Sequence, residues 1–522
     1  MEQIIQTHSA SDAVRIINAN LEELGSEVTI SASDSASLVC SKLNSVFAVL
    51  DEPTELTSSM SGSEFIVAVN ANFEALAEGS AGIGTLKLLH WSDTHDAERT
   101  TPRVNSLLGT DNSLYAIFTG DAGAGDFNGP GSTMYTISNA YKTRFLMCAG
   151  NHDTYDSSVS NGNVVLHAQK GITQKIVEQI SGTQDSPIVW GGPIDEEDGK
   201  RIASYYYRDI LPTYSENDNP TGFNKKVRVI VLDQYEVDVC GLPSNITDTS
   251  SAVYPYAKHR TIYSQAQIDW FIGTLQSMKR ADVDYFIIAQ HEPPVGHSTD
   301  NSDFLREARR ANKFIAATNG AYPEDLSNHG GVDYNWCVYQ NGGVIARIVN
   351  AYLNKSQDSF SFHNYLSGDA SYNGDNDVVQ VNVDFTREDT IIPFLFWLCG
   401  HVHREYCGYH PNYPNQLILC VDCAKWAAGG GWSDLNRSST DDSEKVVLNK
   451  VTINFSTRKI LVERIGDNII RGLTVAGQYY KGTNETNGVE RNWVQFNFKR
   501  KNGEFFESED ETITNPSTNN EN

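Results

Sequence analysis

The stretch Phe145-Leu146-Met147-Cys148-Ala149-Gly150-Asn151-His152-Asp153 gives the clearest indication of the fold. It opens with a short apolar run that shows no polar alternation, which is typical of a strand buried on both faces. The run stops at a glycine and then presents an amide, an imidazole and a carboxylate in succession. In α/β domains, ligands bind just past the carboxyl ends of the strands. The stretch therefore predicts a buried strand that ends at a functional site.

From Thr85 onward, apolar strand candidates alternate with helical segments, which is the pattern of an α/β domain. Ser264 and Gln267 have the spacing of a capping box ahead of one helix. A further helix is expected from Asp303 to about Ala317, and residues 447–465 alternate like a β-hairpin. The expected strands are Leu86–Ser92, Leu114–Thr119, Phe145–Ala149, Val227–Leu232, Tyr285–Ala289, Phe394–Cys399 and Leu417–Val421.

Polar side chains follow five of these strands. The five motifs are Asp93-Thr94-His95, Gly120-Asp121, Gly150-Asn151-His152-Asp153, His291 and Gly400-His401-Val402-His403. Alternate residues of an extended segment share a face, so Asp93 and His95 are expected to point the same way. Each motif alone is more often a set of ordinary hydrogen-bonded groups than a ligand site. Carboxylates, an amide oxygen and neutral imidazoles gathered at five strand ends, however, predict a site for a divalent metal such as Mn, Fe or Zn.

This ordered set resembles the motifs of the calcineurin-like metallophosphoesterases, which run D-x-H, G-D, G-N-H-D/E, a later H and then G-H-x-H. The resemblance covers roughly residues 85–466. It implies an α/β fold in which two mixed β-sheets form a sandwich flanked by helices, with a two-metal site at one edge. It also implies that Asp93, His95 and His403 hold one metal ion, that Asn151, His291 and His401 hold the other, and that Asp121 bridges both.

The sequence departs from the family pattern immediately after Asp121. The family often has further acidic or amide residues there, whereas this chain continues Ala122-Gly123-Ala124-Gly125. The departure leaves substrate preference open but does not touch the ligand set.

Two divalent cations about 3.5–4 Å apart can clamp the attacking and leaving oxygens of an in-line displacement, and a water that they share becomes acidic enough to give hydroxide at neutral pH. Such chemistry needs no nucleophilic serine or cysteine. The expected activity is therefore hydrolysis of phosphate mono- or diesters. His152 is the candidate for donating a proton to the leaving oxygen, and Asp153 either orients His152 or caps the turn. Arg404 is expected to be a surface residue more than a phosphate contact.

Residues 1–82 are predicted to form a separate module. Ser11 is a candidate N-cap for a helix that closes at Gly25, a second helix is expected over residues 36–50, and residues 28–30 and 64–69 resemble strands. No internal repeat is evident, and a Gly-rich linker follows at residues 78–84. We interpret the module as an attachment or oligomerisation element. The phosphoesterase domain would then span 83–470 with insertions at 154–226 and 318–376, followed by an extension over 471–522 that ends in an acidic tail.

The chain of 522 residues has a formal net charge of −26, which argues against binding nucleic-acid backbone or an anionic membrane through the bulk surface. Bound metal ions would supply the positive charge that an anionic substrate needs. The start of the chain shows no signal peptide and no membrane span is evident, so a cytoplasmic protein is expected. The eight scattered cysteines, including the pair Cys420 and Cys423, are expected to be reduced thiols, mostly in the core.

One alternative to an enzyme remains open at this level. The additional N-terminal module and the acidic surface also suit a structural or virion-associated protein that uses the domain mainly for binding, assembling as a homo-oligomer or into a virion through residues 1–82. The complete ligand set favours the enzyme, because a scaffold would tolerate the loss of any ligand.

Overall fold

The structure of the protein is a computed structural model. It describes residues 14, 16–18, 30–31, 34–47, 56, 65, 69, 85–95, 100–122, 133–150, 153, 155–156, 165–166, 169–180, 187–212, 226–236, 261–294, 341–363, 378–388, 390–401, 406–410, 413, 415–421, 424, 446–455, 459–466, 474–475, 478–479, 493–497, 499–501 and 504–507.

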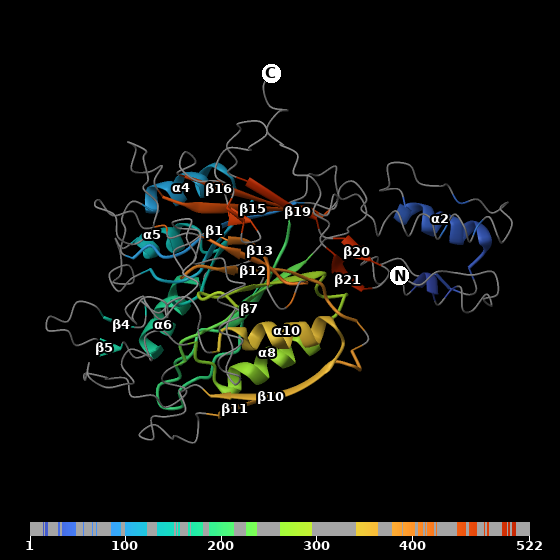
Figure 1. Cartoon of the computed structure of the whole chain (residues 1–522). Coiled ribbons are helices and arrows are strands. Elements are labelled where there is room, and N and C mark those ends of the chain that lie inside the picture. Colours follow the sequence, from blue (N-terminus) through green and yellow to red (C-terminus); the bar gives the residue numbers. More distant parts are fainter. Residues whose placement is uncertain are drawn as a thin grey trace.

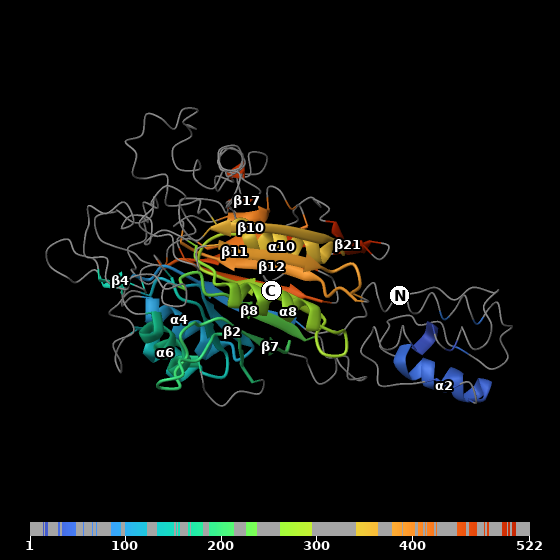
Figure 2. The same ribbon diagram turned by 90° about the horizontal axis from the view of Figure 1, so that it is seen from below.

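Two mixed β-sheets form the body of the molecule (Figures 1 and 2). Within the described residues, the first has six strands in the order β19 (Trp493–Asn497), β16 (Lys459–Ile465), β15 (Leu448–Asn454), β1 (Thr85–Trp91), β2 (Leu114–Phe118) and β3 (Phe145–Met147). The second has nine strands in the order β18 (Gln478–Tyr479), β17 (Thr474–Val475), β13 (Tyr406–Tyr409), β14 (Leu417–Cys420), β12 (Phe394–Cys399), β9 (Tyr285–Ala289), β8 (Val227–Val231), β7 (Tyr206–Ile210) and β6 (Val189–Trp190). Strands β1 to β3 are parallel, as are β8, β9, β12 and β14. The carboxyl ends of the parallel strands therefore lie at the same end of each sheet.

Helices flank both sheets. Alongside the six-stranded sheet lie α4 (Thr100–Thr110), α5 (Thr133–Ala140) and α6 (Gln169–Ile180). Alongside the nine-stranded sheet lie α8 (Gln265–Ser277) and α10 (Gly343–Leu353), covered in turn by the hairpin of β10 (Gln357–His363) and β11 (Val378–Asp384), as Figure 1 shows. Two short pairs, β4 (Tyr155–Asp156) with β5 (Val165–Leu166) and β20 (Lys499–Lys501) with β21 (Glu504–Glu507), complete the named strands.

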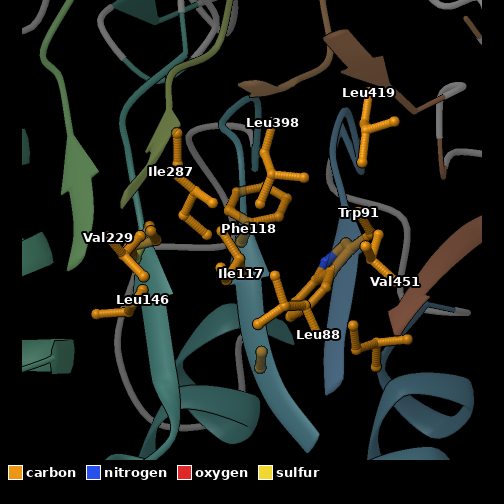
Figure 3. Close-up of a cluster of buried hydrophobic side chains, with 14 of the residues drawn as sticks. Leu88, Trp91, Ile117, Phe118, Leu146, Val229, Ile287, Leu398, Leu419 and Val451 are labelled. Carbon is orange, nitrogen blue, oxygen red and sulfur yellow. The ribbon is translucent and has the colours of Figure 1, made fainter. Parts of the chain in front are cut away.

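The core between the two sheets is apolar and closely packed. Figure 3 shows Leu88 and Ile117 of the six-stranded sheet in one cluster with Ile287 and Leu398 of the nine-stranded sheet. Burying one such side chain contributes about 1.5–3 kcal/mol relative to leaving it exposed. Strands β8 and β12 are buried along their whole length, which explains why they carry apolar residues without alternation. The predicted sandwich of two mixed sheets flanked by helices is confirmed.

The strand predictions from sequence are confirmed for all seven candidates, with ends that differ by no more than two residues. The predicted hairpin is also present as β15 and β16. Of the two hydrogen bonds in the predicted capping box of Ser264 and Gln267, the structure has one. Ser264 Oγ accepts from Gln267 N at 3.1 Å, but the backbone N–H of Ser264 donates to Glu236 at 2.6 Å and not to Gln267. The buried Glu236 side chain accepts the hydrogen bond from the backbone N–H of the N-cap residue, Ser264. The Gln267 side chain instead forms hydrogen bonds with the backbone N–H and carbonyl of Asp233.

In the N-terminal module the predicted second helix is confirmed as α2 (Ala36–Phe47), and residues 14 and 16–18 are helical as predicted. The predicted strand at 64–69 is wrong, because Phe65 and Val69 are helical. A short apolar run does not distinguish a buried strand from a buried helix by periodicity alone. Ile30 lies outside any strand. The predicted helix from 303 to 317, the hairpin turn at 457–458 and the tail after 507 lie outside the described residues.

The two long segments that the sequence marks as insertions contain regular structure. Residues 154–226 supply α6, the edge strand β6 and its neighbour β7, while residues 318–376 supply α10 and β10. The C-terminal extension supplies edge strands to both sheets, since β17 pairs with β13 and β19 pairs with β16. Among the described helices, none combines the length and the apolar character that a bilayer crossing requires.

Candidate active site

The ends of four strands meet where the two sheets come together. Asp93 and His95 follow β1, Asp121 follows β2, His291 follows β9 and His401 follows β12, and all five side chains are buried. The backbone N–H of His401 donates to Asp93 Oδ2 at 2.8 Å, and His291 Nδ1 lies 2.6 Å from the carbonyl oxygen of Thr119. Hydrogen bonds at the site thus tie one sheet to the other.

These side chains form two groups that share one residue. In the first group, His95 Nε2 lies 3.8 Å from Asp93 Oδ1 and 3.8 Å from Asp121 Oδ2. In the second, His291 Nε2 lies 3.3 Å from Asp121 Oδ2 and 2.9 Å from His401 Nδ1. Within each group the three candidate ligand atoms all lie within 4.8 Å of one another, which fits coordination of a cation by each group. Five of the seven predicted ligands are therefore brought together, while Asn151 and His403 lie outside the described residues.

The ligands are presented by left-handed turns and not by extended strand. The φ angle is 58° at Asp93, 44° at His95, 59° at Asp121 and 67° at His401. Asp93 and His95 do point the same way, as expected, but from left-handed turns past the strand and not from an extended segment. A residue other than glycine in this region costs on the order of 1–3 kcal/mol and persists only where its surroundings impose it. Here the backbone N–H groups of Asp93 and His95 are held by the carbonyls of Gly120 and Asp121 at 2.9 and 3.0 Å.

Glycines allow the strand ends to approach this closely. Gly120 has a φ of 92°, and a Cβ there would lie 2.7 Å from His291 Nδ1. A Cβ on Gly150 would lie 2.2 Å from Asp121 Oδ1. Both distances are shorter than any normal contact, so a side chain at either position would displace a candidate ligand. The glycines that directly precede Asp121 and Asn151 therefore permit this close packing.

The negative charge of the site shows in the pKa of His291. Burial alone lowers this pKa, but the carboxylates of Asp121 and Asp93 and the hydrogen bonds to Asp121 and Thr119 outweigh it and raise the pKa to about 10. The same negative field attracts a divalent cation. His90 is a useful contrast, since burial lowers its pKa to about 3 and its Nε2 lies 2.9 Å from Thr119 Oγ1. His90 is therefore a neutral core histidine, whereas His291 faces the carboxylates.

Asp153, predicted to orient His152 or to cap the turn, is seen in contact with backbone. Its Oδ2 accepts from the N–H of Gly150 at 2.7 Å and from the N–H of Asp121 at 2.9 Å. The carboxylate is fully buried. It therefore joins the end of β3 to the end of β2 and positions Asp121. His152 lies outside the described residues, so its catalytic role stays a prediction.

A further strand end borders the site and was not assigned a role from the sequence. Strand β8 pairs with β9 and leads into Asp233, Gln234, Tyr235 and Glu236, all buried. Gln234 Oε1 accepts from the N–H of Glu292 at 2.6 Å, next to the ligand candidate His291. The signal in the sequence was the same as at the other sites, an apolar strand followed by polar residues, but without a histidine or glycine to mark it.

Glu292 is the centre of this polar network. Tyr235 Oη donates to its Oε1 at 2.7 Å, and Thr261 Oγ1 donates to its Oε2. The carbonyl of Thr261 accepts in turn from Asn341 Nδ2 at 3.0 Å. The network holds the backbone beside His291 and ties it to the chain at residues 261 and 341. These contacts give His291 a fixed support from the nine-stranded sheet and its connections.

Comparison with known proteins leaves the chain without near relatives. No family model matches the sequence, and no curated protein matches it. Among solved structures, a purple acid phosphatase from yellow lupin seeds is 9% identical with a TM-score of 0.29, covering 79% of this chain and 53% of its own. An NAD nucleotidase from Haemophilus influenzae is 10% identical with a TM-score of 0.28, covering 70% of this chain and 47% of its own. A calcineurin-like phosphoesterase from Bacillus subtilis is 13% identical with a TM-score of 0.24, covering 59% of this chain and 92% of its own.

This chain thus spans about half the length of the first two structures. All three likenesses are distant, and the chain's own features are more specific. Its two mixed sheets agree with the fold that the resemblance of its strand-end motifs implies.

Proposed function

We propose that this protein hydrolyses phosphate mono- or diesters with the help of two divalent metal ions. The observation that carries the proposal is the position of Asp121, whose carboxylate belongs to both groups of candidate ligands. A carboxylate has two oxygens and can serve two cations at once. Carboxylates together with imidazoles suit Mn, Fe or Zn.

The residues that would hold the ions follow from the two groups. Asp93 and His95 would hold one ion and His291 and His401 the other, with Asp121 between them. The resemblance adds His403 to the first ion and Asn151 to the second. When bound, ions of this kind acidify a water molecule and offset the negative charge of a phosphate group. They would do so in a chain whose own net charge of −26 repels an anionic substrate.

The chain's residues supply position and protons. Asp153 accepts a hydrogen bond from the N–H of Asp121, and Gly120 forms the tight backbone turn before it. The hydrogen bond from His401 N to Asp93 Oδ2 joins the two sheets at the site. His152 would donate a proton to the leaving oxygen or stabilise charge that develops on the phosphate.

Metal removal tests this function directly. Treatment with a chelator should abolish turnover of a chromogenic phosphate ester, and Mn²⁺ or a similar ion should restore it. Metal analysis of the purified protein should find up to two ions per chain, and parallel assays with a monoester and a diester would distinguish the substrate classes. Full activity in the chelated protein would exclude the metal-dependent mechanism.

A further inference from the structure

The N-terminal module contains the same side-chain-to-backbone contact twice. Asn18 donates from Nδ2 to the carbonyl of Ile30 and accepts from the N–H of Ile30, both at 2.7 Å. Asn44 makes the same two hydrogen bonds with Leu56, at 2.8 and 2.9 Å. In each case the asparagine lies in a helix and its partner follows 12 residues later. We call this pair of hydrogen bonds the asparagine clip.

The sequence around the clips repeats with a period of 26 residues. Asn18, Asn44 and Asn70 are equally spaced, and each is preceded by an aliphatic residue. The first and third segments match closely: Ile17-Asn18-Ala19-Asn20-Leu21-Glu22-Glu23-Leu24 against Val69-Asn70-Ala71-Asn72-Phe73-Glu74-Ala75-Leu76. The middle segment, Leu43-Asn44-Ser45-Val46-Phe47-Ala48-Val49-Leu50, keeps the asparagine and the apolar positions only. This divergence of the middle copy is why the repeat is not evident from sequence alone.

Burial follows the same period. Ile17, Leu43 and Val69 occupy equivalent positions, are all buried, and all lie in helix. Ile30 and Leu56, the partners of the two clips, are each 2% exposed. An asparagine clip satisfies the backbone N–H and carbonyl of one residue that has no strand partner. That residue can therefore bury its apolar side chain although it lies in an irregular segment.

The start of the repeat is marked as well. The backbone N–H of Leu38 donates to Ser35 Oγ at 3.2 Å, so Ser35 caps α2. Ser9 and Ser61 lie 26 residues before and after Ser35. The middle copy therefore consists of a capping serine, a helix that carries the asparagine nine residues later, and a segment that returns to the asparagine.

We propose that residues 9–84 contain this unit three times in tandem, the third copy being two residues short where β1 begins, with Asn70 in the role of Asn18 and Asn44, and that they form a modular arm attached to the phosphoesterase domain. Figures 1 and 2 both show α2 standing apart from the two sheets. In repeat proteins each unit packs mainly on its neighbours, and about three units are needed for a stable array. The reach of the arm is then set by its number of units, independently of the metal site.

Changes of length in the full-length chain test the period. Duplicating residues 37–62 in tandem adds one whole unit and joins equivalent positions, whereas removing residues 37–49 takes out half a period and leaves Leu56 without Asn44. Amide hydrogen exchange should find the segments around residues 17 and 69 still protected in the first variant and unprotected in the second. Equal protection in both variants, or loss in both, would overturn the repeat.

Single substitutions test the third clip. Asn18→Ala, Asn44→Ala and Asn70→Ala should each speed amide exchange in the arm, by about tenfold for the loss of two hydrogen bonds. Asn20→Ala and Asn72→Ala are matched controls, since these asparagines recur only in the first and third copies and are not part of the clip. Phosphoesterase activity should be unchanged in all five variants. If Asn70→Ala leaves exchange as slow as its control Asn72→Ala while Asn18→Ala does not, the third copy is not built like the others.

Discussion

Asp121 is the residue on which the arrangement of the site depends. It lies in a left-handed turn and its N–H donates to Asp153. Its Oδ2 lies 3.8 Å from His95 Nε2 and 3.3 Å from His291 Nε2. No other described residue belongs to both groups of candidate ligands. Its position therefore decides whether two ions can be held side by side.

Replacing this shared carboxylate should affect both ions. We expect Asp121→Asn to lose both metals, because a neutral amide bridges two cations poorly. Metal analysis of the purified variant and its activity on a chromogenic ester would measure the effect. Asp111→Asn is a suitable control, since Asp111 binds Lys87 and Ser113 away from the site. Retention of two ions in Asp121→Asn would show that the carboxylate does not bridge.

His152 is expected to act on protons and not on metal. His152→Gln should keep the metal content and lower kcat by roughly 10²–10⁴, the usual range for a lost general acid or base. Steady-state kinetics combined with metal analysis separates these roles. Loss of metal in this variant would instead identify His152 as a ligand.

At the scale of single elements, the start of α8 holds a buried carboxyl whose charge is unfavourable. Burial raises the pKa of Glu236 to about 8, and the neighbouring Asp233 adds to this against the hydrogen bonds from Ser264 and Gln267. Since the unfolded chain has the ordinary value of 4.5, the folded state binds more protons between these two pKa values. Stability contributed by Glu236 is therefore fully present below pH 4.5 and is lost as the pH rises through about 8.

The variant Glu236→Gln should remove this part of the pH dependence. We expect its free energy of unfolding, measured in urea, to change less between about pH 5 and about pH 8 than that of the wild type. Ser277→Ala is the control, because it removes a hydrogen bond to the carbonyl of Thr274 at the other end of α8 and should lower stability by about 1 kcal/mol equally at both pH values. An unchanged slope in Glu236→Gln would place the titration elsewhere.

At the scale of the whole molecule, the described candidate ligands all follow strands of the two sheets, and none of them lies in residues 1–82. A chain that begins near Gly82 should therefore keep its metals and its kcat. We expect its assembly state in light scattering to change, since a small module gains stability from a partner. If the truncated protein stays folded but loses catalysis, the arm contributes to the active site and the proposed division of the chain is wrong.

The sequence alone determined the strands, the helix after Ser264 and the identity of the candidate ligands. These features are local: an unbroken apolar run specifies a buried strand, and a polar group directly after it specifies a strand end, whatever the rest of the chain does. The five ligand candidates that the structure describes were all identified in this way. Local pattern failed at residues 64–69, where an apolar run is compatible with either helix or strand.

Only the tertiary structure decided which groups meet. Asp121, His291 and His401 are far apart in the chain and become neighbours because β2 lies in one sheet and β9 and β12 lie in the other. The left-handed turns at Asp93 and His95, the backbone contacts of Asp153, and Glu236 as the partner of the Ser264 N–H depend on the same packing. The repeat of the arm likewise became visible through two identical clips, because a divergent sequence can preserve a contact that few of its residues define. Nonlocal pairing is set by the burial of both sheets against each other, and no stretch of sequence encodes it on its own.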